Sequence, residues 1–201
     1  NVIGGNTNGD GNVISGNTIA GIRIADDLGG NVIADNFIGT DAAGAAALPN
    51  GDGILVLDTP SVVIGGPAGA ENVISGNQNN GISLQGGAGL TIAGNFIGTD
   101  ATGTFAVPNS TGILIDNPLS IVIGSTAGGM NVISGNTRNG IAVLAMTTGA
   151  KTPERRAATT GVAPEPGTRI VGNRIGTDGT GMNDLGNGRK GVEWGDCGCK
   201  G

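Results

Sequence analysis

Asn-Val-Ile-Ser-Gly-Asn stands at residues 12–17 and returns unchanged at 72–77 and 131–136. The copies begin 60 and then 59 residues apart. A second phrase, Phe-Ile-Gly-Thr-Asp or its variant Arg-Ile-Gly-Thr-Asp, begins at Phe37, Phe96 and Arg174. The chain therefore holds three copies of one long unit, and internal repeats of this kind are typical of solenoids.

Each long unit divides again at a glycine that precedes a short apolar run. These glycines are Gly21, Gly53, Gly81, Gly112, Gly140 and Gly191. A repeat of about 30 residues would also suit helical arrays, but those need amphipathic stretches longer than any stretch between these glycines. The pattern instead predicts coils of three strands, each about three to five residues long, joined by Gly, Asn and Asp turns.

Strand alternation defines the expected core. In the run at 21–24, Ile22 and Ile24 point to one face and Arg23 to the other. Stacked coils then give two inward columns, Ile22, Ile54, Ile82, Ile113 and Ile141 in one and Ile24, Val56, Leu84, Ile115 and Val143 in the other. The outward column is Arg23, Leu55, Ser83, Leu114, Ala142 and Glu193. Asparagine closes the same strand in three coils, at Asn17, Asn77 and Asn136. We expect these amides to stack at a corner and to hydrogen-bond along the axis.

The composition narrows the classes of function. There are 42 glycines, three Phe and one Trp, with neither Tyr nor His, so the core is expected to be aliphatic and the commonest acid–base residue is missing. The net charge of −6 disfavours nucleic acid as a partner. No apolar run reaches the roughly 18 residues of a membrane span, so we expect no membrane insertion. The chain begins at Asn1 inside a repeat unit, which indicates a piece of a longer protein.

One insertion interrupts the single domain expected over residues 1–201. Residues 147–168 are rich in Thr, Ala and Pro and cannot continue a strand, so they predict a surface loop. The loop is basic through Lys151, Arg155 and Arg156. These residues would either clamp an acidic sugar or a partner, or be solvated like any charged surface loop.

The C-terminal end is expected to be irregular over residues 195–201. Its two cysteines, Cys197 and Cys199, are either incidental thiols, one side of an intermolecular bridge, or half of a soft-metal site. Trp194 occupies a core-column position just before them and would plug the open end of the core. Open solenoid ends carry unpaired strand edges, so we expect that copies of this chain can associate end to end.

Carboxylates that follow the inward strand are candidates for catalysis. Asp26, Asp58 and Asp116 stand at nearly the same offset in their coils and form an acidic ridge. Polysaccharide hydrolysis needs two carboxylates across the scissile bond, and a ridge could supply them. The alternative is that turn-forming residues occupy repeated turns by default.

The Ile-Gly-Thr-Asp turns supply a second set of carboxylates, Asp41, Asp100 and Asp178. Carboxylate, hydroxyl and carbonyl oxygens could bind calcium there, whereas the alternative is an Asp turn that accepts backbone N–H bonds. No other cofactor is expected. A lyase needs an acidic cation site beside an Arg or Lys that takes a proton. Arg169 and Arg174, which flank the strand leading to Asp178, are the best local match.

The repeat phrases resemble a known family. Gly-Ile-x-Leu, as at 81–84, and Asn-x-Ile-x-x-Asn, as at 72–77, are similar to the right-handed β-helix repeats of the pectate-lyase-like superfamily. The phrase at 95–104 resembles repeat regions of large bacterial surface and secreted proteins. The resemblance covers nearly the whole chain except 145–168 and the last few residues. It implies an all-β, right-handed parallel β-helix of about six coils, located extracellularly or at the cell surface.

The resemblance leaves two classes of function open, because the superfamily includes polysaccharide lyases, glycosidases, epimerases, adhesins and non-catalytic stalks. We favour a non-catalytic solenoid segment of a surface, adhesive or filament-forming protein whose outer rows contact carbohydrate or neighbouring molecules. The alternative is a polysaccharide lyase or glycosidase. Ice binding would need a flat Thr-rich row, but Thr40, Thr99 and Thr177 recur only in alternate coils.

Overall fold

Eighteen short strands build the whole described structure, a computed structural model. The described residues are 1–5, 7, 9–116, 119–125, 129–145 and 167–196. Among these residues there are strands, turns and bends but no helix. Residues 147–166 of the insertion, which include Lys151, Arg155 and Arg156, and both cysteines lie outside the described residues.

The strands form three parallel sheets, which we name by their first strand. The β1 sheet contains β1 (Val2–Gly4), β4 (Val32–Ala34), β7 (Val63–Ile64), β10 (Ala88–Ile92), β13 (Leu119–Ile123) and β16 (Arg169–Ile170). The β2 sheet contains β2 (Val13–Ile14), β5 (Phe37–Ile38), β8 (Asn72–Ile74), β11 (Asn95–Ile97), β14 (Val132–Ile133) and β17 (Arg174–Ile175). The β3 sheet contains β3 (Ala20–Ala25), β6 (Asp52–Leu57), β9 (Asn80–Gln85), β12 (Thr111–Asp116), β15 (Ile141–Ala145) and β18 (Val192–Asp196).

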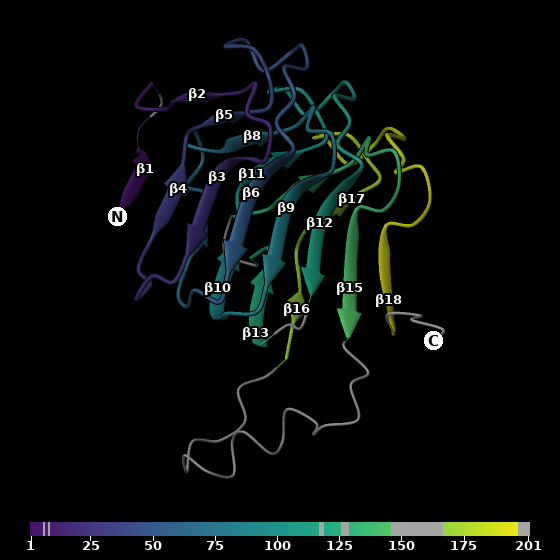
Figure 1. Cartoon of the computed structure of the whole chain (residues 1–201). Helices are drawn as coiled ribbons and strands as arrows, with labels where there is room; N and C mark the ends of the chain where they lie inside the picture. Colours follow the sequence, from purple (N-terminus) through teal and green to yellow (C-terminus); the bar gives the residue numbers. More distant parts are fainter. Residues whose placement is uncertain (6, 8, 117–118, 126–128, 146–166, 197–201) are drawn as a thin grey trace.

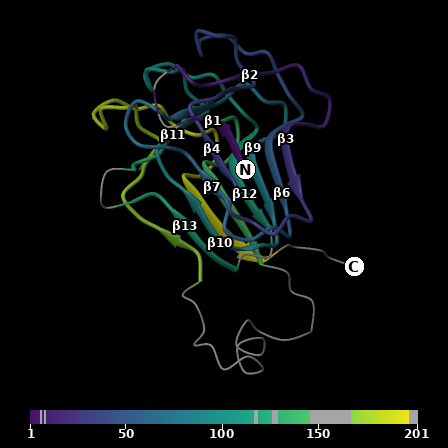
Figure 2. The ribbon, with the colours of Figure 1, turned by 90° about the vertical axis from the view of Figure 1, so that its left-hand side faces the viewer.

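Three consecutive strands make one coil, and each strand pairs in parallel with the strand three places later in the chain. The chain is therefore a right-handed parallel β-helix of six coils, as the sequence predicts. Figure 1 shows the coils side by side from the N-terminal to the C-terminal end, and Figure 2 looks toward the N-terminal end. Coils 1, 3 and 5 carry the hexapeptide, and coils 2, 4 and 6 carry the Ile-Gly-Thr-Asp loop.

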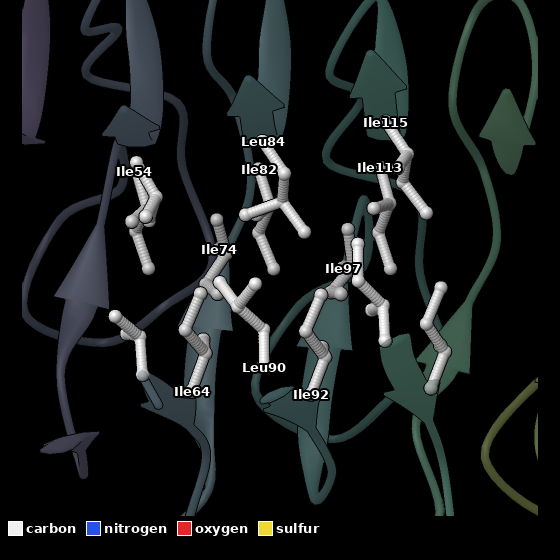
Figure 3. Packing of buried hydrophobic residues seen from close by; sticks show 14 of the residues in the cluster. Ile54, Ile64, Ile74, Ile82, Leu84, Leu90, Ile92, Ile97, Ile113 and Ile115 are labelled. Atoms are coloured by element: carbon white, nitrogen blue, oxygen red, sulfur yellow. The ribbon is translucent and has the colours of Figure 1, made fainter. Parts of the chain in front are cut away.

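Aliphatic columns fill the interior between the three sheets. In the β3 sheet, Ile54 pairs in register with Ile82, and Ile82 with Ile113, and all three side chains are fully buried. The register of the predicted columns and of the outward column from Arg23 to Glu193 is thereby confirmed, although Ser83 and Ala142 of the outward column are buried. The β1 and β2 sheets add a column each: Ile3, Ile33, Ile64, Ile92, Ile123 and Ile170, then Ile14, Ile38, Ile74, Ile97, Ile133 and Ile175. Figure 3 shows these side chains meeting at the centre.

A glycine stands next to the first residue of each β3-sheet strand, and in coils 1 to 5 the next coil approaches it closely. A Cβ on Gly53 would lie 2.5 Å from the carbonyl oxygen of Gly81 and 2.9 Å from the side chain of Asn77. Any side chain at this point would force adjacent coils apart. The recurring Gly-Ile signal in the sequence thus has a packing cause.

Two rows of asparagine run the length of the solenoid. The first asparagine ladder is Asn12, Asn36, Asn72, Asn95, Asn131 and Asn173. The second asparagine ladder is Asn17, Asn50, Asn77, Asn109, Asn136 and Asn187. At every step the Nδ2 of one amide donates to the Oδ1 of the next at 2.8–3.1 Å. Each ladder satisfies buried polar groups that would otherwise be costly.

Candidate functional site

The Asp of each Ile-Gly-Thr-Asp turn holds its own loop together. In coil 4, Asp100 Oδ1 accepts bonds from the backbone N–H groups of Thr104 (2.8 Å) and Phe105 (3.0 Å). Its Oδ2 accepts the hydroxyl of Thr102 at 2.6 Å. An isolated antiparallel bridge between Thr99 and Ala106 closes the base of the same loop. The carboxylate is therefore the internal cap of a tight loop.

The other two copies repeat this arrangement. Asp41 Oδ1 accepts the backbone N–H groups of Ala45 and Ala46 at 2.9 and 3.2 Å. Asp178 accepts the hydroxyl of Thr180 and the side-chain amide of Asn183, both at 2.6 Å. These donors favour the ionised form in each copy, as one expects for a carboxylate that accepts several bonds.

The same donors explain the acidity of the three carboxyl groups. The N–H groups of Ala45 and Ala46 lower the pKa of Asp41, and the Thr180 hydroxyl, followed by the Asn183 amide, lowers the pKa of Asp178 well below its ordinary value. Burial raises the pKa of Asp100, but the Thr102 hydroxyl and backbone N–H groups outweigh it, so this pKa is lowered too. All three groups are ionised at neutral pH.

The three turns do not share one cation site. They belong to coils 2, 4 and 6, so neighbouring carboxylates are separated by two coil spacings, roughly 10 Å. Within the described part of the chain, no group of three or more His, Cys, Asp or Glu side chains is placed to hold a metal ion. Calcium at an individual turn stays a prediction, and it would compete with the N–H donors that already contact the carboxylates.

The acidic ridge is divided between two register positions. Asp116 pairs with Gln85, whereas Asp26 and Asp58 each follow the paired residues Ala25 and Leu57. Asp26 and Asp58 have positive φ angles of 54° and 44°, a backbone conformation that Asp tolerates at turns. The structure therefore brings Asp26 and Asp58 together on adjacent coils and leaves Asp116 one residue earlier.

Arg169 and Arg174 lie in different sheets, in β16 and β17. Arg169 is exposed and pairs with Val122. Arg174 pairs with Val132 and donates from Nη1 to the carbonyl oxygen of Gly179. Neither makes an ion pair with Asp178 among the described residues, where Lys190–Glu193 is the ion pair that occurs.

Arg174 occupies the position in coil 6 that Phe96 occupies in coil 4. In coil 4 the ring of Phe96 lies under Gly103, where an added Cβ would come within 2.8 Å of it, and the Arg174 side chain lies in the same relation to Gly181 in coil 6. The outward residue of the β2 sheet thus supports the loop in both coils. This contact and the bond to Gly179 give Arg174 a structural role in the loop, and its catalytic role stays a prediction.

One surface hollow of about 160 Å³ lies outside the β2 sheet. Its lining includes Glu71, Phe96, Met130 and Arg174. None of the ridge carboxylates lines it. The hollow brings Glu71 and Arg174 to a common surface, but its lining lacks the second carboxylate that glycoside hydrolysis needs.

Comparison with known proteins gives no assignment. No family model, curated protein or solved structure matches the chain. Among the described residues, no helix is both long enough and apolar enough to span a bilayer.

The asparagine ladders are the feature that sequence reasoning found only in part. It predicted the stacking of Asn17, Asn77 and Asn136 but missed the residues of coils 2, 4 and 6 that stand between them, and it missed the first ladder altogether. A signal for the first ladder exists, because all six of its members stand two residues before the inward Ile of the β2 sheet.

Proposed function

We propose that this chain is a non-catalytic structural segment of a surface, adhesive or filament-forming protein, in which a rigid β-solenoid presents its outer rows to carbohydrate or to neighbouring molecules. The observation that carries the proposal is the commitment of the Asp41, Asp100 and Asp178 carboxylates to their own loops. An active site on a regular scaffold ordinarily breaks the local pattern. Here the residues with candidate chemistry repeat it.

The cellular location of the chain and its relationship to a known family are part of the same proposal. The Gly-Ile-x-Leu and Asn-x-Ile-x-x-Asn phrases support a place near the pectate-lyase-like β-helices and an extracellular or cell-surface location. Contact with polysaccharide is part of the proposal, and the net charge of −6 opposes binding to nucleic acid.

The test is incubation with a panel of uronic and neutral polysaccharides, with and without calcium. Unsaturated products would be followed by ultraviolet absorbance and new reducing ends by a colorimetric assay. We expect no turnover. Turnover that is abolished in Asp26→Asn or Asp58→Asn, but kept in the matched Asp116→Asn variant, would instead establish a glycosidase at the paired ridge carboxylates. Turnover lost in Arg169→Ala would establish a lyase.

A further inference from the structure

The outer face of the β3 sheet alternates between large and small side chains. Leu55 of β6 and Leu114 of β12 point outward, and both are half-buried. Ser83, which pairs in register with both leucines, is 1% exposed, and Ala142, which pairs with Leu114, is 5% exposed. Taller neighbours roughly 4.8 Å away therefore cover the small side chains. The face carries two leucine ridges, each with a groove beside it.

The β3 sheet also has the widest outer face of the three sheets (Figure 1). Its strands have five or six residues each, whereas those of the β2 sheet have two or three. A second outward column therefore fits on this face, two residues after the first, and includes Leu57, Gln85, Asp116 and Leu144. The two leucines are half-buried. A broad face with several partly exposed leucines is typical of a surface that binds another protein.

One two-fold rotation makes this face complementary to itself. Its axis runs parallel to the strands between β9 and β12, so coil 3 of one copy faces coil 4 of the other, and coil 2 faces coil 5. Leu55 of one copy then lies over Ala142 of the other, and Leu114 lies over Ser83. Each ridge enters a groove, and each contact occurs twice. A two-fold axis along the solenoid would instead place every coil against its own copy and set ridge against ridge.

The polar side chains of the face match under the same rotation. Gln85 of coil 3 meets Asp116 of coil 4, so that the side-chain amide of one copy can donate to the carboxylate of the other. Arg23 of coil 1 meets Glu193 of coil 6, which pairs opposite charges. Both pairs stand at equal positions along their strands. Shape and charge therefore select one register.

We propose that two copies of this chain associate through their β3 sheets, face to face, with the solenoid axes in opposite directions and coils 3 and 4 at the centre. Six strands roughly 4.8 Å apart, each with about 16 Å of its length in contact, give about 450 Å² per copy. This area lies at the low end for specific interfaces and predicts a weak dimer. The face is on the flank of the solenoid, so further coils would extend it without covering it. The inference rests on the proposed structural role and names its neighbouring molecule, a second copy.

The experiment is sedimentation velocity over a wide concentration range on the full chain, with a reducing agent to keep Cys197 and Cys199 from linking molecules. We expect a monomer–dimer equilibrium. Leu55→Ala empties a groove and Ala142→Leu opposes leucine to leucine, so either change alone should lower the association constant about tenfold. The double variant exchanges ridge and groove and should restore association. Leu55 and Ala142 lie three coils apart in one copy, about 14 Å, so this rescue cannot arise within a single molecule.

The matched control is Val63→Ala, which truncates an exposed aliphatic side chain on the β1 sheet and should leave association unchanged. Circular dichroism checks that every variant keeps its fold. A wild-type chain that stays monomeric at its highest soluble concentration, growth beyond a dimer, or a double variant no better than the single ones would overturn the face-to-face dimer. None of these results would produce polysaccharide turnover, so failure of this inference is distinguishable from failure of the proposed function.

Discussion

The central coils and the end coils share one sequence pattern but differ in how completely neighbouring coils cover their side chains. Asn77 in coil 3 is 2% exposed and is bonded to amides on both sides, whereas Asn17 in coil 1 is exposed and bonded to the ladder on one side. Ile82 in coil 3 is fully buried, whereas Val192, at the same column position in coil 6, is 42% exposed. In a solenoid each coil is stabilised by its neighbours.

This difference teaches that a residue's contribution depends on its coil as much as on its type. Identical substitutions at equivalent positions should therefore give unequal losses, larger in the middle and smaller at the ends. Three pairs of variants test this, and a set of Asp variants tests the loops; each can be measured by urea or acid unfolding followed by circular dichroism.

The largest difference is expected in the core columns. Ile82→Ala should lower the free energy of unfolding by about 4 kcal/mol, because a buried aliphatic group is lost and the coils on both sides hold the cavity open. Ile22→Ala, in the same column of coil 1, should cost about 2 kcal/mol because only coil 2 packs against it. Equal losses in urea unfolding would contradict the dependence on coil position.

Substitutions in the asparagine ladders should show the same order, with smaller losses in the free energy of unfolding. Asn77→Ala leaves one N–H of the Asn50 amide without its acceptor and removes a donor from Asn109 Oδ1, at an expected cost of about 3 kcal/mol. Asn17→Ala, at the exposed end, should cost about 1 kcal/mol. If the end variant proved as damaging as the central one, the ladder would act through something other than the burial of its amides.

A pair of glycines separates backbone strain from crowding. Gly16 and Gly76 have similar φ angles of 79° and 73°, but an added Cβ meets nothing within 4 Å at Gly16 and lies 2.6 Å from the Gly39 carbonyl oxygen at Gly76. Gly16→Ala should cost about 1 kcal/mol, for the left-handed backbone alone. Gly76→Ala should cost about 1 kcal/mol more because the neighbouring loop must move. Equal unfolding midpoints would refute the crowding argument.

Acid should act on the loops through their carboxylates. The folded pKa values of Asp41, Asp100 and Asp178 are lowered, so the folded state binds these protons less readily than the unfolded state does. Their stabilisation is complete above the unfolded pKa of about 3.9 and is lost as the pH falls through the lower folded values. Asp178→Asn should flatten this acid dependence slightly. An unchanged pH profile in all three Asn variants would show that the loops do not need the charge.

The fold could be predicted because its signals are local and repeated. Alternation within four residues gives the inward side chains, and the glycine marks where each strand begins, so the columns through Ile54 and Ile82 follow from spacing alone. Partners in the first asparagine ladder lie between 23 and 42 residues apart. That variation hides them until the coil register is known.

The candidate sites could be predicted only as residue types. The sequence indicates that Asp178 lies in a turn, but the number of donors that reach its carboxylate depends on the loop's path. The sequence indicates that Arg174 lies beside that turn, but its contact with Gly181 depends on the path of the backbone. The one-residue offset of Asp116 from the other ridge carboxylates likewise depends on the register of neighbouring strands.

The loops of alternate coils contact one another directly, since Ala101 N donates to the Gly44 carbonyl oxygen at 3.1 Å and Gly179 N to that of Gly103 at 2.7 Å. The smallest module that can be duplicated or deleted is therefore a pair of coils. Inserting a single coil would place neighbouring loops on adjacent coils or three coils apart instead of two, and would interrupt this stack of loops. A designer who wishes to lengthen the rod should add about 60 residues at a time, the spacing between hexapeptide copies.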